Sequence, residues 1–300
     1  MKKSHVLLFL ILANVFWAGN YVVGQFVVQE MTPLEMTFIR WAIAIFLLFP
    51  LAHWIEKPDW KSVWKQWKLL AILGILGILG YNFTLYWALQ YTTAMNASLV
   101  NSMNPALIFL FSAFLLKERV SLLKGAGICI SLIGVLLVLT KGSLLQILHL
   151  DFNQGDLLML IAITIWTFYS IIGRKMKNTP PVSATAVSAF IAVLFLLPFV
   201  LTSGMSFHWS GQAGAGILYI AIFPSVCSFV FWNISLRSIE ASQAGVYLNL
   251  IAVFTAVLTL LLGQHITAFQ VIGGLLVFIG VYLTSKPEAK KVPHSFTQTG

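Results

Sequence analysis

The chain carries very little charge. Lysine, arginine, aspartate and glutamate make up only 9% of its 300 residues, whereas an ordinary soluble protein is about 25% charged. Hydrophobic residues account for 59%, and the mean hydropathy is +0.90. This composition excludes a water-soluble globular fold and indicates an integral membrane protein.

Cysteine is also scarce, because the chain has only Cys129 and Cys227. Both fall inside hydrophobic segments, so they indicate neither a disulfide framework nor a zinc-binding spacing. The sequence contains no His-Glu-x-x-His motif and no Asp-rich motif, and its serines and threonines have no histidine at membrane depth. An intramembrane enzyme would need such a set, so we expect no enzymatic activity, no cofactor and no bound metal.

Acidic residues are missing from the interior of the hydrophobic segments. The nine aspartates and glutamates and the six histidines all lie near segment ends. Proton relays within a membrane usually use carboxylates or histidines, so uncoupled facilitation or exchange is better supported than proton coupling. Arg40 is the one basic residue clearly inside a segment. We expect it to be a structural or gating group paired with Glu35 or with nearby carbonyl groups.

Hydrophobic runs of about 20 residues recur from end to end, and this length lets a helix cross a hydrocarbon layer about 30 Å thick. The runs lack the alternation of apolar and polar residues that barrel strands show. The sequence therefore predicts an all-α membrane protein with ten transmembrane helices, at residues 5–27, 34–53, 68–90, 93–116, 120–140, 155–175, 182–203, 212–236, 242–262 and 268–285.

The basic residues indicate the orientation, because short cytoplasmic loops retain Lys and Arg. With the N-terminus inside, all 18 Lys and Arg residues except Lys141 and Arg40 fall on the cytoplasmic side of the ten-helix map. Both termini are therefore expected to be cytoplasmic. The polar segment 286–300 has too little apolar surface to fold alone, and we expect a disordered cytoplasmic tail there.

The chain also repeats itself. A shift of 145 to 149 residues superposes Trp17 on Trp166, Asn104 on Asn249 and Gly134 on Gly280. The shift predicts a first five-helix repeat at residues 5–142 and a second one at 153–285. Because five is odd, the second repeat must enter the membrane in the opposite sense. Inverted repeats of this kind are a signature of secondary transporters, whose halves rock about a site near the midplane.

Several motifs of the first repeat carry a family resemblance: Trp17, the Pro33 turn followed by Arg40, Asn104-Pro105, the turn Leu116-Lys117-Glu118-Arg119, and Gly127 with Gly134. With these residues the repeat unit resembles the EamA-type domain of the drug/metabolite transporter superfamily, in its form of two copies and ten spans. The resemblance covers about residues 5–285. The second repeat departs from the pattern, with Leu250 in place of Pro105, Ser188 in place of Arg40, and Gln264 where such repeats usually have Glu.

The resemblance implies a metabolite exporter or facilitator of a bacterial cytoplasmic membrane. Its central cavity would be formed by the first, third, fourth, sixth, eighth and ninth spans. The expected partners are the lipid bilayer and a small-molecule substrate, with no nucleic acid, and a monomer is sufficient for such an activity.

Uncharged polar side chains inside a membrane favour the bundle interior, because facing lipid leaves their donors and acceptors unpaired. Trp17 and Trp166 differ from interfacial tryptophans, since each falls near the middle of its span and each is the repeat-mate of the other. Hydrogen bonding between helices, or packing for the tryptophans, is the alternative role. We hypothesise that one substrate cavity is lined by most of a set of twelve: Asn14, Trp17, Asn20, Tyr81, Asn82, Asn101, Asn104, Trp166, Tyr169, Ser225, Tyr247 and Asn249. Structural or gating roles are expected for Arg40, Pro105, Glu118 and Pro224.

A cavity of aromatic and amide groups suits neutral or zwitterionic solutes, and without clustered Lys or Arg it suits phosphorylated substrates poorly. The sequence therefore predicts a secondary transporter of amino acids or related metabolites that works by alternating access. A multidrug or lipophilic-compound exporter is the alternative, and an intramembrane enzyme is a further one with less support.

Overall fold

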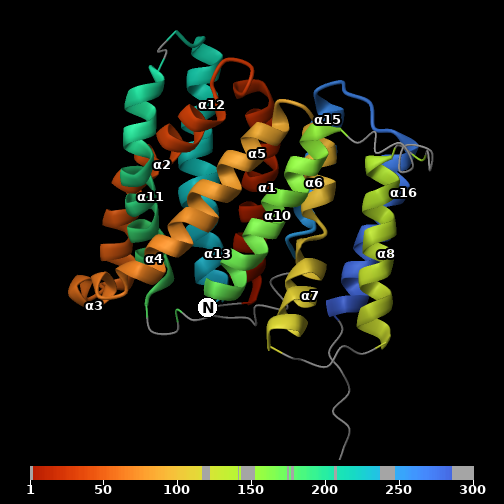
Figure 1. Ribbon diagram of the computed structural model, residues 1–300, viewed down its shortest axis with the longest axis horizontal. Coiled ribbons are helices and arrows are strands. Elements are labelled where there is room, and N and C mark those ends of the chain that lie inside the picture. The colour runs from red at the N-terminus through yellow and green to blue at the C-terminus, as the bar shows by residue number, and fades with distance from the viewer. Residues whose placement is uncertain are drawn as a thin grey trace, which may run out of the picture.

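A computed structural model describes residues 3–116, 122–140, 142, 153–173, 176, 179–205, 208–236 and 247–285 (Figure 1). Within these ranges every regular element is a helix. The predicted gating residue Glu118 and the predicted tail 286–300 lie outside the described residues.

The first predicted repeat contains α1 (Lys3–Val27), α2 (Pro33–Glu56), α3 (Trp60–Trp64), α4 (Trp67–Leu73), the π-helix η1 (Gly74–Gly80), α5 (Tyr81–Leu89), α6 (Ala94–Asn101), α7 (Asn104–Leu116) and α8 (Leu122–Leu139). The second contains α10 (Gln154–Gly173), α11 (Pro181–Ser203), α12 (Gly211–Ile222), the π-helix η2 (Phe223–Cys227), α13 (Ser228–Leu236), α15 (Leu250–Leu261) and α16 (Ala268–Ser285).

Six helices of the described chain are long and apolar enough to cross a membrane: Ser4–Val27, Pro33–Glu56, Trp67–Leu89, Gln154–Gly173, Pro181–Ser203 and Gly211–Trp232. Shorter apolar helices lie at Gly125–Val138, Leu250–Leu261 and Ala268–Leu283. The third predicted span is the unbroken succession of α4, η1 and α5, whereas the fourth is divided into α6 and α7.

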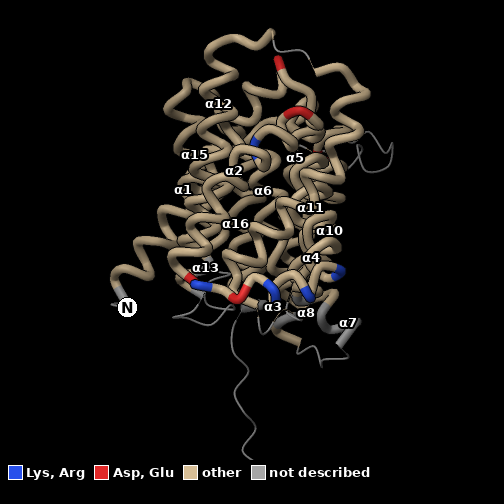
Figure 2. Tube along the Cα trace, turned by 90° about the vertical axis from the view of Figure 1, so that its left-hand side faces the viewer, with Lys and Arg blue, Asp and Glu red and all other residues tan. Residues whose placement is uncertain are grey.

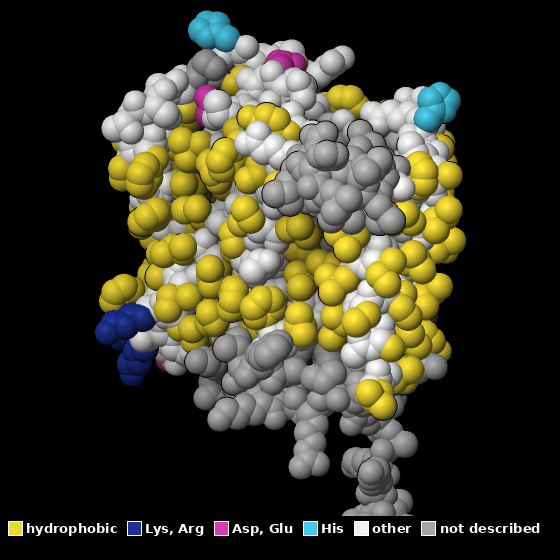
Figure 3. Space-filling view, turned by 45° about the vertical axis from the view of Figure 1, so that its right-hand side comes forward, with side chains coloured by type: hydrophobic (Ala, Val, Ile, Leu, Met, Phe, Trp, Pro, Cys, Tyr) yellow, Lys and Arg dark blue, Asp and Glu magenta, His cyan; other side chains and the backbone are white. Residues whose placement is uncertain are grey.

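The outer surface of the bundle is apolar. Large side chains such as Phe46, Leu122 and Leu261 are 78–95% exposed, and Figure 3 shows a broad band of hydrophobic side chains between polar ends. Lysines gather at one end of the described bundle, around α3 and α4 (Figure 2). An apolar belt of this kind would be unstable in water and suits lipid, so the chain is a multi-pass membrane protein.

α8 and α16, which occupy equivalent places in the two predicted repeats, run antiparallel. Gly134 of α8 lies against Gly273 of α16, since a Cβ atom built on Gly134 would lie 2.6 Å from the Gly273 carbonyl oxygen. Gly127 of α8 lies against Gly280 of α16. The residue numbers of the contacts increase along α8 and decrease along α16, as an inverted repeat requires. Figure 1 shows this pair side by side.

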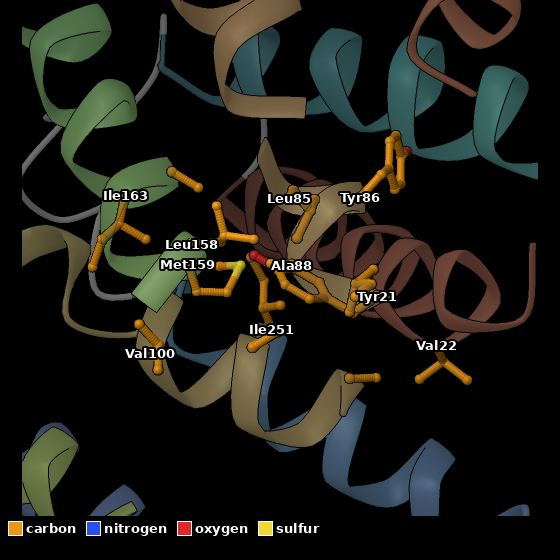
Figure 4. Close-up of a cluster of buried hydrophobic side chains, with 14 of the residues drawn as sticks. Tyr21, Val22, Leu85, Tyr86, Ala88, Val100, Leu158, Met159, Ile163 and Ile251 are labelled. Carbon is orange, nitrogen blue, oxygen red and sulfur yellow. The ribbon is translucent and has the colours of Figure 1, made fainter. Parts of the chain in front are cut away.

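The largest cluster of buried apolar side chains joins the two halves (Figure 4). Tyr21 of α1 and Tyr86 of α5 come from the first half, and Met159 of α10 and Ile251 of α15 come from the second. Their exposed fractions lie between 0 and 4%. The two repeats therefore share one core.

The third span of each half contains a π-helix, η1 in the first and η2 in the second. π-helices are rare and occur frequently at functional sites. A Cβ atom on Gly74 would lie 2.5 Å from the Ser188 carbonyl oxygen in α11, and one on Gly77 would lie 2.5 Å from the Tyr169 ring in α10. Glycine at these two positions thus lets η1 pack directly against helices of the other half.

Candidate functional site

A cavity lies inside the bundle, between the two halves. Side chains from both repeats form its wall: Trp17, Asn20, Tyr21, Arg40, Tyr81, Asn82, Asn101, Asn104, Trp166, Phe229, Leu248 and Ile251. These residues belong to the first, third, fourth, sixth, eighth and ninth predicted spans, with Arg40 added from the second. Eight of the sequence-predicted residues are thereby brought together: Trp17, Asn20, Arg40, Tyr81, Asn82, Asn101, Asn104 and Trp166.

Arg40 is buried in this wall, with 2% of its surface exposed. Its Nε donates to Ser225 Oγ at 2.9 Å, and its Nη1 donates to Asn82 Oδ1 at 2.8 Å and to Asn20 Oδ1 at 3.3 Å. Nη1 also donates to the hydroxyl of Tyr86, which in turn donates to Asn20 Oδ1 at 2.8 Å. All of these partners are uncharged.

Glu35, one of the partners expected for Arg40, makes other contacts. The Glu35 carboxylate closes a capping box at the start of α2, where it accepts from Thr32 N at 2.8 Å and from Thr32 Oγ1 at 2.9 Å. Five residues along an α-helix rotate a side chain by about 140° beyond one full turn. Glu35 and Arg40 therefore point to different faces of α2.

Arg40 also connects the two π-helical regions. Ser225 lies in η2, and Asn82 follows η1 within α5. The Ser225 hydroxyl donates to Ile220 O at 2.8 Å, and Asn82 Nδ2 donates to Gly77 O at 2.9 Å. Each side chain thus binds the carbonyl five residues earlier, which is the spacing of a π turn, and Asn82 Nδ2 also donates to Ile78 O, four residues earlier, at 2.8 Å. The guanidinium thereby joins the third span of one half to the third span of the other.

A second series of side-chain hydrogen bonds runs through the cavity wall, from Tyr21 to Asn104. The hydroxyls of Tyr21 and Tyr81 lie 2.9 Å apart, and the Tyr81 hydroxyl donates to Asn101 Oδ1 at 3.2 Å. Asn104 Nδ2 donates to the same Asn101 oxygen at 2.9 Å. Asn104 is 3% exposed, and its Oδ1 has no hydrogen-bond partner within the described part of the chain. This series of hydrogen bonds therefore ends at Asn104 Oδ1, an acceptor without a donor among the described residues.

The repeat-mates Trp17 and Trp166 both face the cavity but have different surroundings. Trp17 Nε1 donates to Pro224 O in η2 at 3.2 Å, and its ring meets Phe229 edge-on at 5.9 Å between centroids. Trp166 packs between Tyr81 and Tyr169, with centroid distances of 4.8 and 4.9 Å. Pro224, for which a structural or gating role is expected, thus contributes its carbonyl as the acceptor for Trp17.

The helix of the fourth predicted span is interrupted at the cavity. In the ninth predicted span, a turn directly precedes α15. Residues 102–103 separate α6 from α7, and residues 248–249 form a turn directly before α15. Asn104 begins α7, and its repeat-mate Asn249 is the residue before α15. Discontinuous helices at mid-depth leave backbone groups free and are common at transporter binding sites.

Other predicted residues lie behind the described wall. Asn14 Nδ2 donates to Leu10 O at 2.7 Å in its own helix, and Ser225 is buried beneath Arg40. Tyr247 packs near Val6 and Leu10. Further such residues are Tyr169, which covers Trp166; Asn249, at the turn before α15; and Pro105, in the first turn of α7.

Five residues at the site were not predicted from the sequence: Tyr21, Tyr86, Phe229, Leu248 and Ile251. Tyr21 follows Trp17 by four residues and Tyr86 follows Asn82 by four, and residues four apart share a helix face. This spacing could have identified both tyrosines. The three apolar residues carried no signal, because apolar side chains that face a cavity, a neighbouring helix or lipid look alike in a sequence.

The sequence model of the EamA-like transporter family matches residues 5–140 and again 153–286. An uncharacterised transporter of Archaeoglobus fulgidus is 31% identical over 291 residues, covering 95% of this chain and 98% of the relative. An uncharacterised transporter of Bacillus subtilis is 29% identical over 290 residues, covering 95% of each.

One solved crystal structure matches 95% of this chain and 98% of its own, with a TM-score of 0.67. At 21% identity this match shows a shared fold. The matches to the family model cover both predicted repeats and nearly the whole length of the sequence. The chain therefore belongs to the EamA-like transporter family.

Proposed function

We propose that the chain carries small neutral or zwitterionic metabolites, amino acids or related compounds, across a bacterial cytoplasmic membrane. The observation that carries the proposal is the cavity between the halves, lined by both repeats and by amide, hydroxyl and aromatic groups.

Alternating access is supported by links between the halves at opposite ends of α2. At its C-terminal end, the Glu56 carboxylate accepts from Val182 N at 3.0 Å and from Ser183 N at 2.8 Å, at the start of α11. Before its N-terminal end, the Glu30 carboxylate accepts from Ser210 N and Ser210 Oγ, each at 2.7 Å. α2 has 24 residues, so these links are about 36 Å apart. Rocking of the halves would release one link while keeping the other.

The cavity wall also bears on energy coupling and on the alternative cargo. Its described residues carry no carboxylate and one cation, Arg40. Uncoupled facilitation or exchange therefore fits this wall better than an acid-based proton relay. A lipophilic-cation exporter fits less well, because a buried guanidinium repels cations.

The test is uptake and counterflow in proteoliposomes, using the purified full-length chain and a panel of labelled amino acids. We expect exchange of at least one neutral amino acid, independent of an imposed pH gradient. Failure to exchange any amino acid or related metabolite would contradict the proposal. Uptake driven only by a pH gradient would contradict the uncoupled mechanism.

A further inference from the structure

One short segment at an end of the bundle combines positive charge with exposed aromatic rings. Residues 54–68 run from the last turn of α2 through α3 to the first turn of α4. They contain four lysines and four tryptophans. The four lysines, called the lysine cluster below, are all exposed: Lys57, Lys61, Lys65 and Lys68.

The two acidic residues of this segment are engaged in other contacts. The Glu56 carboxylate accepts from the backbone of Val182 and Ser183 at the start of α11. Asp59 caps α3, where its Oδ1 accepts from Lys61 N at 3.1 Å. Among the described residues, no carboxylate forms an ion pair with the lysine cluster. Its charge is therefore free to attract an anion from outside the chain.

α3 presents its lysines away from the bundle. Val63 is 2% exposed and packs in one cluster with Leu70 and Val187. Lys61 and Lys65 lie two residues before and after Val63, and two residues along a helix rotate a side chain by about 200°. Both lysines therefore lie on the side of α3 opposite to its buried residue.

The tryptophans beside the lysines suit the boundary between lipid and water. Trp54, Trp64 and Trp67 are 72%, 38% and 53% exposed, and tryptophan rings favour the headgroup level of a membrane. Lys68 Nζ lies 6.0 Å from the centroid of the Trp67 ring. Figure 3 shows the basic side chains at the edge of the hydrophobic band. Charge and rings thus lie together where phospholipid headgroups surround the protein.

We propose that the lysine cluster binds the headgroup of an anionic phospholipid of the surrounding bilayer. Groups of four to eight Lys or Arg directly beside a membrane helix attract anionic lipids. The ammonium groups bind the phosphate, and the exposed tryptophan rings pack against the glycerol and acyl part. An anion without acyl chains would make only the first of these contacts.

The bound lipid would also act on the contact between the two halves. The turns on both sides of α3 are attached to the second half, since Glu56 binds Ser183 and Gln66 Nε2 donates to Thr179 Oγ1 at 2.7 Å. A lipid held on the outer side of α3 therefore keeps these two contacts in place. Its binding should raise the stability of the whole protein.

The first experiment uses the unaltered full-length chain, purified in detergent and titrated with phosphatidylglycerol or with zwitterionic phosphatidylcholine of the same acyl chains. Native mass spectrometry measures the bound lipid, and thermal unfolding measures the stability. We expect phosphatidylglycerol to bind about 10- to 100-fold more tightly, because several lysines attract its net charge, and to raise the melting temperature more. Equal binding of the two lipids would overturn the proposal.

Inorganic phosphate is the comparison for a free anion. At the same concentration we expect it neither to displace phosphatidylglycerol nor to raise the melting temperature. Displacement of the lipid by inorganic phosphate would overturn the assignment to a phospholipid.

Variants then assign the binding to the lysine cluster. The triple replacement Lys61→Gln, Lys65→Gln and Lys68→Gln is expected to bind phosphatidylglycerol no more tightly than phosphatidylcholine. The corresponding triple replacement by Arg keeps the charge and is expected to keep the preference. Wild-type preference in the Gln variant would overturn the assignment.

A control for net charge removes three lysines of the predicted tail instead, by Lys286→Gln, Lys290→Gln and Lys291→Gln. We expect this variant to retain the preference of the wild type for phosphatidylglycerol. If both Gln variants lose it equally, total charge attracts the lipid and the proposed site is refuted.

Discussion

Ser225 Oγ in η2 accepts a hydrogen bond from Arg40 Nε in α2 at 2.9 Å, across the junction of the two repeats. The same hydroxyl donates to Ile220 O at 2.8 Å. One small side chain thus fixes the guanidinium of one half on the π-helix of the other. Arg40 is thereby held in the cavity wall.

Ser225→Ala is expected to lower the free energy of unfolding by about 1–3 kcal/mol, because a buried guanidinium N–H loses its acceptor. Thermal unfolding of the purified protein in detergent measures the loss. Ser203→Ala is the matched control, because the Ser203 hydroxyl donates only to Val200 O in its own helix among the described contacts. Equal stability of the two variants would contradict the prediction.

Gly134→Ala is expected to separate α8 from α16. The added Cβ would lie 2.6 Å from the backbone oxygen of Gly273, and backbone cannot move aside as a flexible side chain does. Overpacking of this kind costs about 1–3 kcal/mol. Gly125→Ala on the same helix meets nothing within 4 Å and is expected to be neutral or to stabilise by up to about 1 kcal/mol. Thermal unfolding of both variants tests the contrast, and similar melting temperatures would refute it.

The link between Glu30 and Ser210 should depend on pH. Hydrogen bonds from the backbone and side chain of Ser210 hold the pKa of the Glu30 carboxyl below its usual value of 4.5. A lowered pKa in the folded state means that the carboxylate stabilises the fold above pH 4.5 and that this contribution is lost as the pH falls through the lowered value.

Glu30→Gln removes the titrating group and is expected to abolish this part of the acid-induced loss of stability. Melting temperatures of the wild type and the variant between pH 3 and pH 7 would therefore converge at the acidic end. Parallel curves over the whole range would count against the prediction.

Replacement of the two repeat-mate tryptophans should have unequal effects on stability. Trp17→Phe loses the hydrogen bond to Pro224 O, at a cost of about 1 kcal/mol. Trp166→Phe loses no indole hydrogen bond to a described residue and should cost less. Thermal unfolding of the two variants provides the comparison, and a larger loss for Trp166→Phe would be inconsistent with these contacts.

The helical membrane fold could be predicted from the composition and the internal repeat. Apolar runs of about 20 residues have the length of a membrane-spanning helix, and an odd number of spans in each repeat requires the second repeat to be inverted. The polar side chains of the cavity wall could be predicted because a polar side chain that faces lipid leaves its hydrogen-bond donors and acceptors unpaired. Asn14 shares a helix face with Trp17, yet its amide binds the carbonyl of Leu10 in the same helix. Local backbone bonding of this kind removes a polar side chain from a site, and sequence spacing gives no sign of it.

The role of Arg40 depended on contacts that span 185 residues, from α2 to Ser225 in η2. Spacing within one helix could suggest only a neighbour such as Glu35. The π-helices were equally hidden, since Gly74–Gly80 and Phe223–Cys227 read as ordinary apolar helix.

A π turn holds about one residue more than the α-helical turn that it replaces. Deleting a single residue within Gly74–Gly80 would therefore let the widened turn close to an α-helical one, with the residues on either side kept at nearly the same angle around the helix axis. Tyr81, Asn82 and Tyr86 all follow η1, and their side chains keep the direction that an α-helix one residue shorter would give them. The extra residue of η1 is thus absorbed within one turn and does not rotate the side chains that line the cavity.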